Sequence, residues 1–236
     1  MFSPLVLAQW IPDSLGGLPD GGVVVSVDPT LPAKRSVSLL RLDDGAGVLS
    51  LSPARASELG FTDGEHIDGE DAAARIAGAG LSMNDPDHLF YLTVREQEAL
   101  RDEVHGAQTR QLTSDDAGLF EEFTRGAPED ELDEAFVELD HWLVYGTLVD
   151  GALACAASMY PWGGGRLADV GVITHPEFRG RGLGRATVRA ISAEAMRRGY
   201  EPQYRCQREN TASIALARRS GFTHFGEWEV VVPTAD

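Results

Sequence analysis

The chain has 236 residues, of which 43% are apolar and 24% are charged, and its net charge is −17. This composition is typical of a globular protein with one large or two modest domains, and the negative charge argues against nucleic acid as the main partner. No apolar run approaches the roughly 20 residues that cross a membrane, and the apolar residues 1–12 lack the basic start of a signal peptide. We therefore expect a cytoplasmic protein with no membrane partner.

The first part of the chain has the pattern of an α+β unit. Residues 13–22 are rich in Gly, Pro and Asp, which predicts a loop. The apolar segments 37–42 and 48–51 flank a turn-forming stretch, so we expect a β-hairpin there. Two short helices and a strand complete the unit, at residues 53–59, 71–79 and 89–92.

A capping box at Thr93-Val-Arg-Glu96 opens a helix that we expect to reach about residue 104. The Gly106-Ala107 pair that follows is the best boundary, so we predict an N-terminal α+β domain at residues 1–106 and a second domain at residues 107–236. No residue pattern in the N-terminal domain indicates a chemical role. The N-terminal domain could serve either to form a homodimer or to cover the substrate.

Two acidic amphipathic helices are expected at residues 116–125 and 129–140. The side chains expected on their buried faces are Leu119, Phe120, Phe123, Leu132, Phe136 and Leu139. The apolar segments 142–149 and 152–160 flank Asp150-Gly151, which is a strong signal for a second β-hairpin.

A turn at residues 160–165 leads into a strand at residues 167–173. Trp162 in this turn either lines a pocket or packs against its neighbours. The two cysteines, Cys155 and Cys206, form neither a disulfide framework nor a metal-binding spacing. We expect both to be buried on strands, and we expect no metal site.

Three glycines, Gly180, Gly182 and Gly184, follow this strand and open a helix that should end near Arg198, before Gly199. Glycines at a helix start let backbone N–H groups converge, and the helix dipole adds positive charge at the same place. Three arginines supply more positive charge there: Arg179, Arg181 and Arg185. The sequence therefore predicts a site for a phosphate or a pyrophosphate.

The glycine spacing distinguishes between loop types. A Walker loop needs a lysine, and the only lysine of the chain is Lys34, while the dinucleotide fingerprint needs its third glycine one residue later. The pattern Arg179-x-x-Gly182-x-Gly184, preceded by Val172-Ile-Thr-His-Pro176, instead resembles the pyrophosphate loop of the GCN5-related N-acetyltransferases, the GNAT family.

The resemblance covers about residues 108–232. Residues 204–210 resemble the family's fifth strand, which ends in a cofactor-contacting Asn, here Asn210. A helix at residues 211–220 and the Gly221-Phe222 pair precede a last strand at residues 223–232. Upstream, residues 110–116 resemble the family's opening strand. The resemblance implies an α/β (α+β) fold, with a mixed, mostly antiparallel sheet flanked by helices.

In that family the loop holds the pyrophosphate of acetyl-CoA, and the cosubstrate's acetyl group passes to an amine. The resemblance thus implies an N-acyltransferase acting on a primary amine of a small molecule or a peptide. The residues that it places against acetyl-CoA are Val172, Ile173, Thr174, Arg179, Gly180, Arg181, Gly182, Leu183, Gly184, Arg185, Asn210 and Ser213.

The charge distribution suits such a cosubstrate. Between His175 and Arg219 the chain carries ten arginines and four acids, a balance of +6, so the remainder carries −23. A basic segment inside an acidic protein is expected where several phosphates bind. The acidic remainder would attract a cationic amine, although salt would screen this attraction.

The amine must lose a proton before it attacks the thioester. The family commonly places a carboxylate on the fourth strand, and Asp169 stands there, so Asp169 is the candidate base; the alternative is a strand-end residue facing water. Weaker candidates are Glu138, Asp140 and His175. Many family members carry a thiolate-protonating Tyr seven residues after the Asn, and here that position is Ala217. Ser213 and Tyr204 are potential substitutes.

Three functions remain open at this point. The first is an acetyl-CoA-dependent N-acetyltransferase. The second, which Ala217 favours, is a catalytically degenerate CoA-binding sensor or regulatory module. The third is an unrelated α/β protein that binds another phosphate, such as a nucleotide. A degenerate acetyltransferase-like half is a further alternative for the N-terminal domain, although it carries no second glycine loop.

Overall fold

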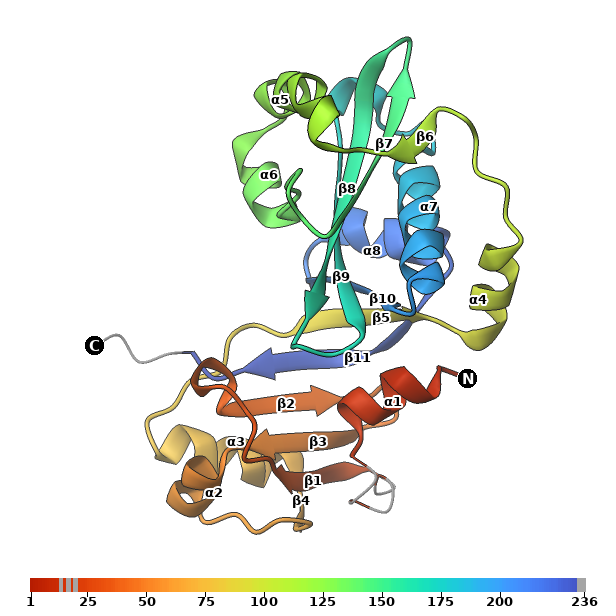
Figure 1. Ribbon diagram of the computed structural model, residues 1–236. Helices are drawn as coiled ribbons and strands as arrows, with labels where there is room; N and C mark the ends of the chain where they lie inside the picture. Colours follow the sequence, from red (N-terminus) through yellow and green to blue (C-terminus); the bar gives the residue numbers. More distant parts are fainter. Residues whose placement is uncertain (13–14, 16–17, 19–20, 233–236) are drawn as a thin grey trace. The chain divides into compact units, whose positions relative to one another are not determined.

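Figure 1 shows the computed structural model, which describes residues 1–12, 15, 18 and 21–232. The predicted loop at residues 13–22 lies mostly outside the described residues. Contacts divide the chain into two units. Unit 1 contains residues 1–5, 90–205 and 211–223, and unit 2 contains residues 6–89, 206–210 and the chain from residue 224 onward.

The sheet of unit 1 has the strand order β5-β10-β9-β8-β7-β6. β9 pairs in parallel with β10, whereas the β9–β8, β8–β7 and β7–β6 pairs are antiparallel. The sheet is therefore mixed and mostly antiparallel, as predicted. The strands are β5 (Asp87–Leu92), β6 (Thr109–Gln111), β7 (Leu143–Val149), β8 (Ala152–Trp162), β9 (Leu167–Thr174) and β10 (Glu201–Gln207).

Helices flank this sheet on both sides. Figure 1 shows α5 and α6 on one face of β7, β8 and β9, and α7 on the other. α5 and α6 cover a core formed by Leu112, Phe123, Val137, Val144, Leu153, Ala156 and Ile173. The helices are α4 (Val94–Arg101), α5 (Ala117–Gly126), α6 (Glu129–Ala135), α7 (Leu183–Arg197) and α8 (Thr211–Arg219), with 3-10 turns at Ser114–Asp116 and Pro176–Phe178.

Unit 2 has the strand order β4-β1-β3-β2-β11. β1 pairs in parallel with β3, and the remaining pairs are antiparallel. The elements are α1 (Pro4–Trp10), β1 (Gly22–Val27), a 3-10 turn (Ala33–Arg35), β2 (Val37–Arg41), β3 (Ala46–Leu51), α2 (Pro53–Leu59), β4 (His66–Ile67), α3 (Gly69–Gly78) and β11 (Phe222–Val230). The register of β11 on β2 runs from Glu227↔Arg41 to Val230↔Ser38, so the C-terminal strand completes a unit built mainly from N-terminal residues.

Most predicted elements are confirmed within a few residues. Both hairpins, α2 and α7 form where expected, and the Thr93 hydroxyl accepts a hydrogen bond from the Glu96 N–H at the start of α4. Cys155 and Cys206 are buried on strands, as expected. The short elements α1, β1 and β4 were not predicted. The division at Gly106-Ala107 into segments with separate roles stays a prediction.

One helix prediction is wrong. Residues 129–140 do not form a single helix, because α6 ends at Ala135 and Phe136 adopts a left-handed conformation with φ 47°. Phe136, which was expected to be buried, is 49% exposed. The other apolar side chains of α5 and α6 pack on the core as expected. Among the described residues, no helix has the length and apolar character needed to span a membrane.

Candidate functional site

The strands β9 and β10 separate at one point. They pair over four residue pairs, and the last of these is Val170↔Tyr204. β9 continues to pair with β8 as far as Thr174. Past Val170, β9 therefore has a ladder partner on the β8 side and an open edge on the side of β10.

Backbone alternation decides which groups face this open edge. Successive residues of a strand direct their N–H and C=O groups to opposite neighbours. The His175 N–H donates to the Ala154 oxygen on the β8 side at 3.0 Å, whereas the Arg166 oxygen accepts from Glu201 on the β10 side at 2.8 Å. Val172 and Thr174 share the parity of Arg166, so their backbone groups point to the open edge. Ile173 has the opposite parity, so its backbone groups point to β8, and its side chain is buried in the core.

The glycine loop lies between β9 and α7. Gly180 and Gly182 have φ values of 74° and 78°, and a Cβ at either position would meet nothing within 4 Å. These two glycines are therefore needed for left-handed backbone and leave open space above it. Gly182 is the N-cap of the 15-residue helix α7, which begins at Leu183. The first N–H groups of α7 have no partners within the helix, which suits an anion.

Gly184 has a different role. A Cβ there would lie 3.2 Å from the Thr174 hydroxyl oxygen and 3.3 Å from a methyl carbon of Leu216. A glycine at this position therefore lets the first turn of α7 approach both β9 and α8 closely.

The three arginines of the loop make different contacts. Arg179 donates from Nε to the Thr174 oxygen at 3.0 Å and forms an ion pair with Glu131 of α6. Arg185 donates to the Arg219 oxygen at 2.8 Å. The guanidinium of Arg181 lies 5.5 Å from the centre of the Phe178 ring. Arg179 thus closes the turn after β9, while Arg181 stays at the exposed loop.

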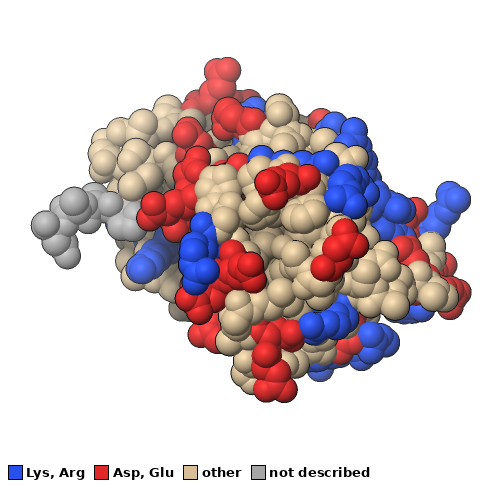
Figure 2. All heavy atoms as spheres, turned by 90° about the horizontal axis from the view of Figure 1, so that it is seen from above, with Lys and Arg blue, Asp and Glu red and all other residues tan. Residues whose placement is uncertain are grey.

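Acidic side chains lie among these basic ones. Figure 2 shows Lys and Arg side chains interspersed with Asp and Glu side chains on the face seen from above. Arg179 is paired with Glu131, and Arg125 with Glu121 at 2.8 Å. The positive charge of the glycine loop is therefore partly neutralised by Glu131 of α6.

The region of the predicted thiolate acid contains a pair of hydroxyl groups. The Tyr204 hydroxyl lies 2.9 Å from the Ser213 hydroxyl, and Tyr204 is 1% exposed. Ala217, at the position of the family's Tyr, is fully buried on α8. Asn210 directly precedes α8 in the chain. In unit 1, Tyr204 and Ser213 thus lie together on β10 and α8.

Asp169 is buried and does not face water. It is 5% exposed, and its carboxylate accepts hydrogen bonds from Tyr160 at 3.2 Å, Gln203 at 3.1 Å and Arg205 at 3.0 Å. Gln203 in turn accepts a hydrogen bond from the Tyr91 hydroxyl. Burial, together with the nearby Asp169 charge, raises the pKa of Tyr160. Asp169 is thus the centre of a buried polar network.

A group that the sequence did not reveal lies on the same face of the sheet. The Nδ1 atom of His141 is 2.8 Å from the Ser158 hydroxyl, and its Nε2 atom is 3.5 Å from a carboxylate oxygen of Glu138. The His141 ring packs against Phe136 and Tyr160, with centroid distances of 4.9 and 5.1 Å. Its position directly before a predicted strand is a signal that could have drawn attention to it.

The remaining candidates have clear positions. Glu138 and Asp140 are exposed in the segment between α6 and β7. The His175 ring lies between Phe123 and Phe178, with centroid distances of 6.3 and 5.9 Å, which agrees with a packed turn residue. Trp162 is 5% exposed and packs in its turn. Among the described residues, no cluster of His, Cys, Asp and Glu is able to hold a metal ion.

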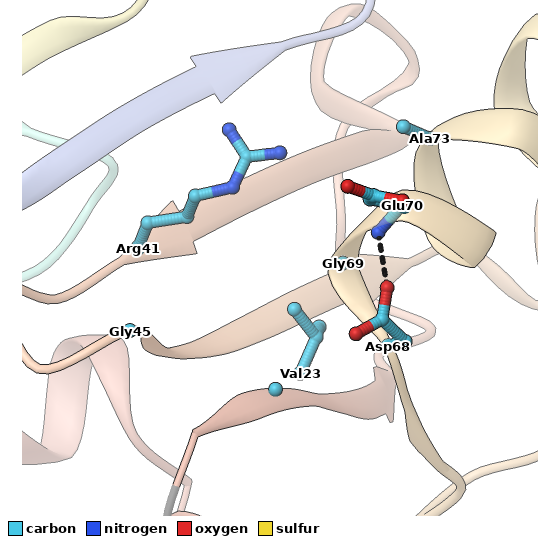
Figure 3. Close-up of a pocket in the computed structure, with 8 residues that line it drawn as sticks. Val23, Arg41, Gly45, Asp68, Gly69, Glu70 and Ala73 are labelled. Carbon is cyan, nitrogen blue, oxygen red and sulfur yellow. Dashed lines mark hydrogen bonds between the residues drawn. The ribbon is translucent and has the colours of Figure 1, made fainter.

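Unit 2 has a hollow of its own, of about 390 Å³ (Figure 3). Its lining includes Arg41 and Asp68. Arg41 forms an ion pair with Glu229 at 2.8 Å, and Asp68 accepts a hydrogen bond from the Glu70 N–H at 2.7 Å. Because these charged groups already have partners within unit 2, the hollow gives no indication of a ligand.

Comparisons with known proteins agree with this geometry. Residues 110–222 match the acetyltransferase (GNAT) family model, whereas no curated protein matches the sequence. A solved GNAT acetyltransferase from Colwellia psychrerythraea is 14% identical, covers 84% of this chain and 81% of its own, and has a TM-score of 0.52. A structure from Novosphingobium aromaticivorans, described as from the GNAT family, is 21% identical and covers 66% of each chain with a TM-score of 0.49. The Colwellia structure shows a shared fold, and residues 110–222 of this chain form an acetyltransferase (GNAT) domain.

Proposed function

We propose that this protein transfers the acetyl group of acetyl-CoA to a primary amine of a small molecule or a peptide. One observation carries the proposal: β9 separates from β10 after Val170, next to a glycine loop that opens α7. An open strand edge can pair with an extended amide-containing chain, and a helix start binds a pyrophosphate. Acetyl-CoA contains both groups.

Each part of the cosubstrate has a proposed partner. The pyrophosphate binds the N–H groups of residues 180–184, with Arg181 and Arg185 adding positive charge. The pantetheine arm pairs with the backbone of Val172 and with the N–H of Thr174, because the Thr174 oxygen already accepts a hydrogen bond from Arg179. Ser213 completes the site within unit 1, and a contact of Asn210 with the cosubstrate stays a prediction from the sequence. Backbone N–H groups along β9 polarise the thioester carbonyl as negative charge develops on its oxygen.

The residue that accepts the proton of the amine does not follow directly from this geometry. Asp169 stays our prediction from the sequence. Its carboxylate already accepts hydrogen bonds from Tyr160, Gln203 and Arg205, so it would act as a base only if one of these donors moved away. The departing thiolate takes a proton from water or from the Tyr204–Ser213 hydroxyl pair.

A second function has one observation in its favour. Ala217 is fully buried where many family members carry a hydroxyl group, so a protein that binds CoA as a sensor without turnover is the alternative. A cytoplasmic location and a role of residues 1–106 in forming a homodimer or in covering the acceptor stay predictions from the sequence.

The test is a calorimetric titration of the purified protein with acetyl-CoA, with NADH and ATP as controls. We expect micromolar binding of acetyl-CoA alone. Release of free thiol in the presence of spermidine, an aminoglycoside or a peptide with a free N-terminus would then establish the transferase. Binding without thiol release would favour the sensor, and preferential binding of ATP or NADH would contradict both.

A further inference from the structure

We propose that His141, assisted by Glu138, accepts the proton of the acceptor amine. This inference rests on the proposed function, and it assigns the base to a residue other than the one that the sequence nominates. It follows from where the imidazole lies, from what holds its two nitrogens, and from how Asp169 is occupied.

The location of His141 is defined by β8 and β9. Its Nδ1 atom contacts Ser158, and Ser158 pairs with Gly171 across the β8–β9 ladder. Gly171 is the first residue of β9 beyond the last pair with β10. His141 is thus held on the strand pair at the point where the open edge begins.

The end of α6 approaches the same point. A Cβ at Gly171 would lie 1.9 Å from the Ala135 oxygen, so the last residue of α6 lies directly on β9. Phe136 then turns the chain away in its left-handed conformation, and its ring packs edge-on against that of His141. A non-glycine residue with positive φ is uncommon and is often found at functional sites. Here it ends α6 just before the segment that carries Glu138 and His141.

The contacts of the ring suit a proton acceptor. If Nδ1–H donates to the Ser158 hydroxyl, the lone pair lies on Nε2, on the side of Glu138. The Ser158 oxygen also accepts the Glu138 N–H at 3.4 Å, so one hydroxyl orients both residues. After Nε2 takes a proton, the Glu138 carboxylate at 3.5 Å stabilises the imidazolium. Imidazole is also the side chain whose ordinary ionisation falls between pH 5 and 8.

The side chains of Asp169 and His141 are both largely enclosed, at 7% and 11% exposure, but their partners differ. The Asp169 carboxylate is enclosed by Tyr160, Gln203 and Arg205, whereas the Glu138 side chain next to His141 is 52% exposed. A base must return its proton to solvent after each turnover. The charged and titratable groups around His141 are Glu138 and Tyr160, with Asp169 behind Tyr160.

The ammonium group of the acceptor gives one proton to Nε2 of His141, and its freed lone pair attacks the thioester carbonyl carbon. The tetrahedral intermediate collapses as the C–S bond breaks. The second proton leaves the nitrogen as the thiolate becomes a free thiol, and the imidazolium releases its proton to solvent. The products are the amide, CoA and one proton.

The test is the pH dependence of kcat/KM for His141→Gln and Glu138→Gln, measured with spermidine, an aminoglycoside and a free-amine peptide. We expect His141→Gln to lower kcat by about 100-fold near pH 7 and to remove the acidic limb of the profile. Free imidazole in solution should restore part of the activity of His141→Ala. Removing the Glu138 charge destabilises the imidazolium, so the acidic limb of Glu138→Gln should move to lower pH.

Calorimetry with acetyl-CoA separates the two proposals. Acetyl-CoA affinity should be unchanged in both variants, and His66→Gln, which removes an exposed histidine of unit 2, should behave like the wild type. Wild-type profiles in both variants would overturn the role of His141 while leaving the transferase intact. Absence of acetyl-CoA binding or of turnover in the wild type would overturn the proposed function and the role of His141 with it.

Discussion

The two halves of the candidate site in unit 1 are built in different ways. The half proposed for acetyl-CoA comes mainly from one continuous stretch, residues 172–185, and uses mostly backbone groups. The half proposed for the amine combines side chains from separate elements: Glu138 and His141 before β7, Ser158 and Tyr160 on β8, Asp169 on β9 and Arg205 on β10.

This difference determines what each half tolerates. Backbone groups keep their positions as long as the local conformation is preserved, so the first half depends on its glycines. The second half depends on hydrogen bonds between side chains, in which one substitution leaves buried partners without a bond. Substitutions in the two halves should therefore separate cosubstrate binding from proton transfer and stability.

The largest effect is expected from Gly182→Val. Valine is strained at φ 78°, and its side chain would cover the N–H groups at the start of α7. Acetyl-CoA affinity, measured by calorimetry, should fall by about 100-fold or more, which corresponds to about 2.7 kcal/mol. The pH dependence of any remaining activity should be unchanged.

Gly164→Val is the matched control. Gly164 also has a positive φ, 74°, and open space around it, but it lies in the turn between β8 and β9. The control should lose a similar amount of stability and keep its affinity for acetyl-CoA. Equal affinities of the two variants would show that the glycine loop does not bind the cosubstrate.

Asp169→Asn addresses the second half. The side chain of Asp169 is 7% exposed and that of its partner Arg205 is 28% exposed, so the substitution leaves a largely buried guanidinium without its carboxylate. We expect the free energy of unfolding to fall by about 2 kcal/mol, as measured by urea denaturation. If Asp169 has only a structural role, the pH profile of Asp169→Asn keeps its acidic limb. Loss of that limb in Asp169→Asn, with normal stability, would make Asp169 the base and exclude His141.

A smaller effect is expected at the start of α5. Two nitrogen–oxygen contacts with Arg110, at 2.6 and 3.0 Å, and the Thr113 N–H hold the pKa of Asp116 at about 2. Because this value is below that of the unfolded chain, the carboxylate stabilises the fold above about pH 4, and the contribution is lost as the pH falls towards 2.

Asp116→Asn should therefore lower the free energy of unfolding by about 1 kcal/mol near pH 6 and by less near pH 2. The measurement is urea denaturation of both proteins at the two pH values. Acetyl-CoA affinity should not change, because α5 lies on the face of the sheet opposite α7. If the difference in stability between the wild type and Asp116→Asn grew as the pH fell, the contacts assigned to the Asp116 carboxylate would be contradicted.

The sequence predicted the continuous features well. The β7–β8 hairpin follows from the apolar segments around Asp150-Gly151, and α7 follows from the glycines at its start and from Gly199 after its end. Both signals are local, because each depends on neighbouring residues only. The family resemblance supplied the mixed, mostly antiparallel character of the sheet, which local patterns do not contain.

The side-chain half could not be predicted in the same way. The contact between His141 and Ser158 joins residues 17 positions apart in the sequence, and that between Asp169 and Arg205 joins residues 36 apart. The periodicity of apolar residues along the chain carries no information about contacts between such distant side chains. The end of α6 was missed because the acidic and apolar pattern continues past Ala135, whereas the close approach to Gly171 is a tertiary effect.

The most direct test of the whole account is an amide NMR titration of isotope-labelled protein with acetyl-CoA. We expect the largest shifts at the N–H groups of Val172, Thr174 and residues 180–185, with little change at Asp68 and Glu70, which line the hollow of unit 2. Binding that shifts the amides around that hollow, while leaving the glycine loop unaffected, would contradict the account.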